Sequence, residues 1–156
     1  KLKISEKNVA MVSSCTTGLH LAMIVSNIKK NDEVLCSSLT FVADANCIKY
    51  VDAKPKFIDI TSSDNWNIST KDILKNITKK TKAIMLINVL GISSDLFKIK
   101  KIANKKNIIL IEDNCESLGS KLKNKYLGTF LSRTLICLKG RIGAMIYGGG
   151  CIKRFF

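Results

Sequence analysis

The sequence predicts an α/β fold in which a mostly parallel β-sheet is flanked by helices. Short apolar, β-branched stretches alternate with segments that carry apolar residues at helical spacing, as in a parallel sheet with crossover helices. The stretch 108–111 reads Ile-Ile-Leu-Ile and ends in two acids, which indicates a buried strand whose carboxyl end reaches a site. With 156 residues, the chain is long enough for one domain with a substantial core.

Each element follows from a local pattern. A short apolar run at 9–12 leads through a hydroxyl-rich loop into apolar residues at helical spacing between 19 and 30. The later strands are expected at 33–37, 55–60, 82–88 and 108–111, and the later helices at 40–48, 69–77 and 96–106. The only proline, Pro55, opens a strand, where a missing N–H is tolerated. We expect residues 121–130 to leave the sheet as a hairpin or turn.

Composition limits the class of protein. Hydrophobic residues make up 46% of the chain and the mean hydropathy is +0.13, which excludes a disordered chain. The apolar runs are shorter than the roughly 20 residues of a membrane span, and no signal-peptide core follows the first residues. The net charge of +14 could indicate nucleic acid, but the lysines are spread along the chain without interleaved aromatic residues. We therefore expect neither a nucleic-acid nor a membrane partner.

The cysteines indicate a reducing compartment. There are six of them at irregular spacings, none in a Cys-x-x-Cys pair, and there is a single histidine. This pattern fits neither a disulfide framework nor the common zinc motifs, so we expect free thiols, no metal site and a cytoplasmic location.

Two stretches are candidates for a binding site. The loop 13–18, Ser-Ser-Cys-Thr-Thr-Gly, precedes a helix, so its backbone N–H groups could bind a phosphate, or its hydroxyl groups could simply cap the helix. Glu112 and Asp113 follow the strand 108–111, and an acid there could cap a following helix or contact a ligand. Phe41 near the start of a helix could belong to the core or lie against a planar ligand.

Six stretches, in order and spacing, together resemble the DegT/DnrJ/StrS family of nucleotide-sugar aminotransferases, which depend on pyridoxal 5′-phosphate (PLP). They are 14–22, 39–46, 53–60, 81–84, 111–116 and 128–130. The resemblance implies the large domain of the fold type I PLP-dependent transferases, in truncated form. It places a partial cofactor-binding domain in residues 1–130 and covers about the first half of a typical family member.

The resemblance also implies roles for single residues. Phe41 would stack on the pyridine ring of PLP, and Asp113 would pair with the ring nitrogen and keep it protonated. Glu116 stands near the cofactor oxygen, where the family usually carries Gln or His, so this candidate catalytic acid is a departure from the pattern. The residues at the start of the first helix would bind the phosphate: Cys15, Thr16 and Thr17.

The segment 131–156 departs from the family pattern. The Schiff-base lysine of the family should fall at Ile142, counted from 128–130, or at Arg141, counted from the later glycines. Lys139 is close but out of register. The simplest interpretation is a truncated or miscalled reading frame that lacks its anchor lysine, so that the fragment itself is inactive.

The function implied by the resemblance is amino transfer to a nucleotide-linked keto-sugar from a donor such as glutamate. Such reactions serve the biosynthesis of cell-surface polysaccharides or deoxyamino sugars, and the full-length parent would be a homodimer. Two alternatives remain: a fragment of a PLP- or PMP-dependent sugar 3-dehydrase, in which His replaces the lysine, and a non-catalytic binding or assembly fragment. A plain nucleotide-binding fold is disfavoured because the loop 13–18 has only one glycine.

Overall fold

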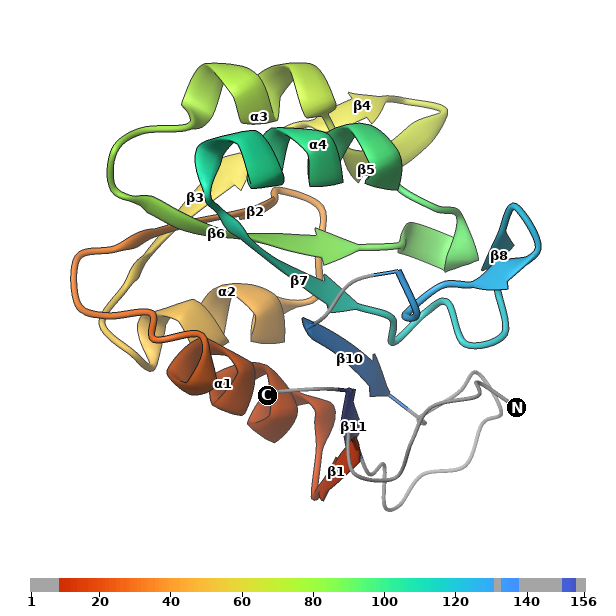
Figure 1. The fold of residues 1–156 in the computed structure, drawn as a ribbon, viewed down its shortest axis with the longest axis horizontal. Coiled ribbons are helices and arrows are strands. Elements are labelled where there is room, and N and C mark those ends of the chain that lie inside the picture. Colours follow the sequence, from red (N-terminus) through yellow and green to blue (C-terminus); the bar gives the residue numbers. More distant parts are fainter. Residues whose placement is uncertain (1–8, 131–132, 138–149, 154–156) are drawn as a thin grey trace.

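The computed structural model describes residues 9–130, 133–137 and 150–153, and its centre is a seven-stranded sheet (Figure 1). The strand order is β1-β11-β10-β7-β6-β2-β3. Neighbouring strands from β10 to β3 run parallel, while β11 is antiparallel to both β10 and β1. The strands are β1 (Val9–Val12), β2 (Glu33–Ser37), β3 (Lys54–Ile58), β6 (Thr81–Ile87), β7 (Ile109–Asp113), β10 (Arg133–Cys137) and β11 (Gly150–Lys153).

Helices cover both faces of the sheet, α1 and α2 on one and α3 and α4 on the other (Figure 1). They are α1 (Cys15–Val25), α2 (Val42–Lys49), α3 (Thr70–Asn76) and α4 (Leu96–Lys106). A strand between two helical layers needs apolar side chains on both faces. In β6, Met85 faces the α1/α2 core, while Ile84 and Leu86 face the α3/α4 core. The predicted α/β sheet flanked by helices is therefore confirmed.

The ends of several elements differ from the predicted ones. Helix α1 begins at Cys15, four residues before the predicted start, because the Ser14 side chain accepts a hydrogen bond from the Thr17 N–H. It ends at Val25, since Asn27 has a positive φ of 55°. Strand β7 includes both Glu112 and Asp113, because the carboxylates of these residues accept hydrogen bonds inside the protein.

Three short pieces complete the described chain. The predicted loop after β3 contains a small antiparallel pair, β4 (Ile60–Ser62) with β5 (Asn65–Ile68). A 3-10 turn, η2 (Val89–Gly91), follows β6. The predicted hairpin is confirmed as β8 (Lys121–Leu122) with β9 (Lys125–Tyr126).

Two strands of the main sheet come from the segment 131–156, which the sequence assigned to a departing tail. Strand β10 pairs with β7, and β11 lies between β10 and β1. These two stretches therefore continue the sheet, and the boundary at residue 130 stays a prediction. Within the described ranges, no helix has the length and apolar character that crossing a membrane requires.

Candidate functional site

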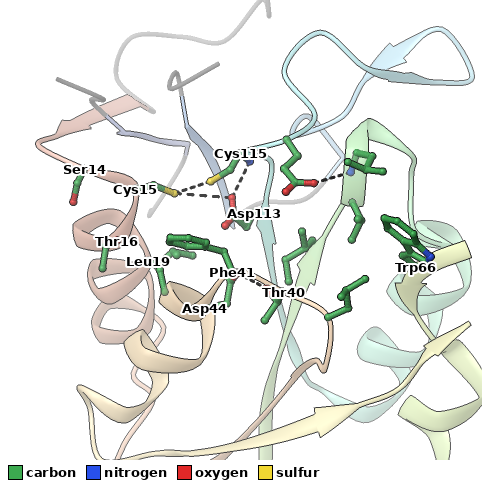
Figure 2. A pocket seen from close by; sticks show the side chains of 16 residues that line it. Ser14, Cys15, Thr16, Leu19, Thr40, Phe41, Asp44, Trp66, Asp113 and Cys115 are labelled. Carbon is green, nitrogen blue, oxygen red and sulfur yellow. Dashed lines mark hydrogen bonds between the residues drawn. The ribbon is translucent and has the colours of Figure 1, made fainter. Parts of the chain in front are cut away.

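A cavity of about 880 Å³ opens where β2, β6 and β7 end and α1 begins (Figure 2). Side chains from five parts of the sequence line the cavity, at the edge where open α/β sheets bind ligands. Its volume lies within the usual range for small-molecule sites. Five of the six site residues predicted from the sequence line this cavity: Cys15, Thr16, Phe41, Asp113 and Glu116.

The start of α1 supplies free backbone donors. The Ser14 side chain caps the helix by accepting from the Thr17 N–H at 3.1 Å, and the Gly18 N–H bonds to the Ser14 carbonyl at 3.1 Å. The N–H groups of Cys15 and Thr16 precede these and have no acceptor within the helix, so they can bind an anion. The structure confirms that Ser14 caps the helix, while the phosphate contact of Cys15 and Thr16, which line the cavity, stays a prediction.

Thr17 is placed differently from the prediction. It is exposed and does not line the cavity. Its N–H is bound to Ser14, and its hydroxyl also lies 2.8 Å from the Ser14 oxygen. The proposed phosphate contact of Thr17 is therefore not supported by its position, because the cap occupies its polar groups.

Asp113 ends β7 inside the cavity with only 4% of its surface exposed. Its Oδ1 accepts the Cys115 N–H at 2.9 Å. No helix follows β7 within the described residues before the β8/β9 hairpin, so Asp113 does not cap a helix. Burial raises the pKa of Asp113, while hydrogen bonds from Cys115 act in the opposite direction. The ligand-contact alternative is the one that the geometry favours.

Asp44 is a second buried carboxyl group in the cavity, which the sequence analysis did not single out. It is 1% exposed and lies in the first turn of α2, where the Thr40 hydroxyl donates to its Oδ2 at 2.6 Å (Figure 2). Its Oδ1 is buried and makes no hydrogen bond within the described part of the chain. Burial, followed by the negative charge of Asp113, raises the pKa of Asp44 to about 8. Since burial raises the pKa of both acids, the pair favours a state in which at least one of them is protonated.

Glu112 points to the other side of β7 and has a structural role. It is fully buried, and its Oε1 accepts from the Asn88 side chain at 2.9 Å and from the Gly128 N–H at 3.2 Å. Asn88 also donates to Asn114 at 2.9 Å and accepts from the Ser94 N–H at 3.0 Å. This buried network holds the loops after β6 and β7 together behind the cavity.

Glu116 holds the 3-10 turn at the cavity wall. Its Oε2 accepts the Leu90 N–H at 2.7 Å, and Leu90 has an unfavourable positive φ of 54°. The next residue, Gly91, has φ 81°, and a Cβ there would lie 2.7 Å from the Ser120 hydroxyl. The glutamate therefore stabilises a strained bend, and its predicted contact with the cofactor stays a prediction.

Two aromatic side chains lie in the cavity wall. The ring of Phe41, just before α2, is 73% exposed, so this residue is not part of the core. Trp66 in β5 is 46% exposed, and its indole N–H donates to the Ser63 carbonyl at 2.8 Å. No local pattern predicted a site role for Trp66, because only the β4/β5 pair brings this residue to the sheet edge.

Cys15 and Cys115 meet beside Asp113, where their Sγ atoms lie 2.9 Å apart (Figure 2). Both are free thiols, as predicted, and so are Cys36 and Cys47. Contact with Cys15, burial and the charge of Asp113 all raise the pKa of the Cys115 thiol. The ligand atoms of Cys15, Asp113 and Cys115 lie within 4.8 Å of one another, so the group could hold a metal ion, which the sequence did not predict.

The predicted absence of an anchor lysine concerns a part of the chain outside the described residues. Lys139, Arg141 and Ile142 all lie there. Among the described residues that line the cavity, none is a lysine. The cavity can hold a flat ligand with an anionic end and a protonated ring nitrogen. The start of α1 suits the anion, Phe41 suits the flat ring, and Asp113 suits the protonated nitrogen.

Solved structures with the same fold include aminotransferases and a sugar dehydratase. The aminotransferase TlmJ of Streptoalloteichus hindustanus superposes with a TM-score of 0.87 and 26% sequence identity, over 98% of this chain and 42% of that chain. The E. coli GDP-4-keto-6-deoxy-D-mannose-3-dehydratase, with bound hydrated PLP, gives a TM-score of 0.81 and 29% identity, over 95% of this chain and 39% of that one. The predicted class, the large domain of fold type I PLP-dependent transferases, is confirmed.

The sequence comparison gives the particular family. Residues 2–137 match the DegT/DnrJ/EryC1/StrS aminotransferase family, so the chain belongs to this family, as predicted. GDP-perosamine synthase of Escherichia coli O157:H7 is 42% identical over 132 residues, which are 82% of this chain and 36% of that protein. The chain spans about a third of the length of the curated relatives that it matches.

Proposed function

We propose that this chain forms the PLP-binding part of an aminotransferase that acts on a nucleotide-linked keto-sugar. One observation carries the proposal: a single cavity gathers the free N–H groups of the α1 start, the exposed ring of Phe41 and the buried carboxylate of Asp113. These three features complement the phosphate, the flat ring and the ring nitrogen of PLP. The PLP bound in the similar E. coli dehydratase supports the same cofactor.

Each residue of the cavity has a separate task in this proposal. The N–H groups of Cys15 and Thr16 would hold the phosphate, and Phe41 would lie against the ring. Asp113 would hold a proton at the ring nitrogen, while Asp44, hydrogen-bonded by Thr40, keeps its own proton and leaves Asp113 the charged partner. When bound, PLP supplies an electron-withdrawing ring that stabilises negative charge developing on the substrate carbon.

The proposed substrate is a GDP-linked keto-sugar, and the proposed amino donor is an amino acid such as glutamate. The nucleotide is suggested by the names of two similar proteins, GDP-perosamine synthase and GDP-4-keto-6-deoxy-D-mannose-3-dehydratase. We also infer a homodimer for the whole protein, supported by the exposed apolar side chains Leu39, Phe41 and Val42 beside the cavity. A cytoplasmic location fits the four free thiols of the described residues.

A sugar 3-dehydrase is the second candidate, favoured by the 29% identity to the E. coli dehydratase. The identity of 42% to GDP-perosamine synthase makes the aminotransferase the better candidate. The two chemistries differ in the residue that follows β10, Lys in one and His in the other, and that position lies outside the described residues. The third alternative is a non-catalytic PLP-binding or assembly fragment.

Trp66, the only tryptophan of the chain, allows the cofactor to be titrated directly, because it lines the cavity. We expect PLP to quench Trp66 fluorescence saturably and Asp113→Asn to weaken PLP binding on the order of tenfold or more, since a charge-assisted hydrogen bond is lost. The matched control is Asp52→Asn, an exposed acid outside the cavity, which should leave the Kd unchanged. Equal affinities for wild type and Asp113→Asn would contradict the proposed role.

A further inference from the structure

Two thiols in the cavity have no role in the proposed function. Cys15 is the first residue of α1, and Cys115 follows β7 by two residues. Their sulfur atoms lie 2.9 Å apart, although the residues are 100 positions apart in the sequence. Both side chains are half-buried and line the cavity, so a small molecule that enters the cavity can reach them.

The other two described thiols are shielded from reagents in solution. Cys36 and Cys47 are fully buried, at 0% exposure each. Burial, followed by the negative charge of Asp44, raises the pKa of Cys36 to about 12, and the same two causes raise the pKa of Cys47. Since an oxidant in solution must first reach the sulfur atom, Cys15 and Cys115 are the accessible pair among the described thiols.

The spacing of the two sulfur atoms suits a disulfide better than a metal site. A disulfide bond is about 2.05 Å long, so the atoms need to approach by less than about 1 Å. Two thiolates on tetrahedral zinc, with Zn–S distances of about 2.3 Å, stand about 3.8 Å apart. The third possible ligand, Asp113, already accepts the Cys115 N–H with its Oδ1.

We propose that Cys15 and Cys115 form an oxidative modification site, at which a hydroperoxide joins the two sulfur atoms in a disulfide across the cavity. One thiol attacks the peroxide, takes one oxygen as a sulfenic acid and releases water when hydrogen peroxide is the oxidant. The second thiol then attacks that sulfur, forms the S–S bond and releases a second water. In sum, two thiols and one hydrogen peroxide give one disulfide and two waters.

The disulfide would connect two parts of the cavity that are far apart in the chain. Cys15 directly precedes Thr16 at the start of α1, and the Cys115 N–H binds Asp113. The cross-link therefore fixes the anion-binding end to the carboxylate end and closes a loop of about 100 residues. A long loop closed in this way restricts the unfolded chain, so the oxidised protein should melt at a higher temperature.

The test oxidises the whole 156-residue chain with stoichiometric hydrogen peroxide and maps the cross-links by mass spectrometry of unreduced peptides. We expect a Cys15–Cys115 linkage, the loss of two of the four free thiols of the described residues, and a rise of roughly 10 °C in the thermal midpoint. Cys115→Ser should abolish all three results, while Cys36→Ala, outside the cavity, should keep them. Linkage mapping of the wild type needs no substitution and stands if a variant fails to fold.

Three results would overturn the proposal. These are a linkage between other cysteines, oxidation of Cys15 or Cys115 beyond sulfenic acid without a linkage, and thiols that resist peroxide until a chelator removes zinc. PLP in excess should slow the linkage, because both thiols line the cavity that it would fill. This effect of PLP rests on the proposed function. If PLP does not slow disulfide formation, PLP does not occupy this cavity, but the proposed Cys15–Cys115 disulfide is unaffected.

Discussion

At the scale of single residues, the carboxyl groups of Asp44 and Asp113 in the cavity differ in the hydrogen bonds that favour their charged forms. Asp113 is held by N–H donation from Cys115, which favours its charged form, whereas Asp44 has one oxygen without a hydrogen bond among the described residues. Two buried acids that affect each other cannot both be charged without a large penalty. We expect Asp44 to carry the proton, which would leave Asp113 as the charged partner for the ring nitrogen in the proposed function.

This arrangement predicts that stability falls as pH rises from about 4 to about 8. Asp44 keeps its proton in the folded state up to pH about 8, while the unfolded chain releases it near 4, so the folded state binds more protons in this window. Each pH unit then lowers the free energy of unfolding by up to about 1.4 kcal/mol. Asp44→Asn should reduce this dependence, because the amide cannot titrate and can still accept from Thr40, while the raised pKa of Asp113 contributes the remainder.

Urea unfolding of the ligand-free protein between pH 5 and 8 measures this effect. The difference between Asp44→Asn and wild type should favour the variant increasingly towards pH 8. Asp52→Asn, which replaces an exposed acid, should give no such trend. Parallel pH curves for wild type and Asp44→Asn would show that Asp44 is charged in the folded protein.

At the scale of elements, two helices begin with a serine N-cap, but only one of these caps lies at the cavity. Ser14 caps α1 at the cavity, and Ser69 caps α3 on the opposite face by accepting the Asp72 N–H at 3.2 Å. Neither cap contacts the other, and Ser69 does not line the cavity. Substituting each serine in turn therefore distinguishes the effect of a cap on stability from its effect on ligand binding.

Ser14→Ala and Ser69→Ala should each destabilise the protein by about 1 kcal/mol, because each leaves one N–H of a first helical turn without its acceptor. Only Ser14→Ala should also weaken PLP binding, since the donors of Cys15 and Thr16 belong to the turn that frays. Chemical denaturation and Trp66 titration measure the two effects. A similar loss of PLP affinity in Ser69→Ala would indicate a general loss of folding instead.

At the scale of the whole molecule, the sheet order brings distant segments to one edge. The parallel strands β2, β6 and β7 all end at the cavity, and their connections supply Phe41, Leu90 and Cys115. The anchor position of the family falls at Arg141 or Ile142, neither of which can form an imine, so we expect PLP to bind without a covalent anchor.

Treatment of the PLP complex with borohydride tests this expectation. The cofactor should wash off the denatured protein, and the mass of the chain should stay that of the unmodified protein. A chain that keeps one reduced cofactor on Lys139 would show that this lysine serves as the anchor. Pyridoxamine 5′-phosphate, which lacks the aldehyde, is the matched control ligand.

The sequence by itself determined the α/β class, most elements to within a few residues, the family and five of the residues that line the cavity. It could do so because burial of a strand on two faces and the start of a helix leave local patterns, such as Ile-Ile-Leu-Ile before Asp113. Only the tertiary structure decided which groups meet. Asp44, Trp66 and the pair of Cys15 with Cys115 come together from distant segments, which a local pattern does not record. Thr17 does not line the cavity, and its N–H donates to the Ser14 cap.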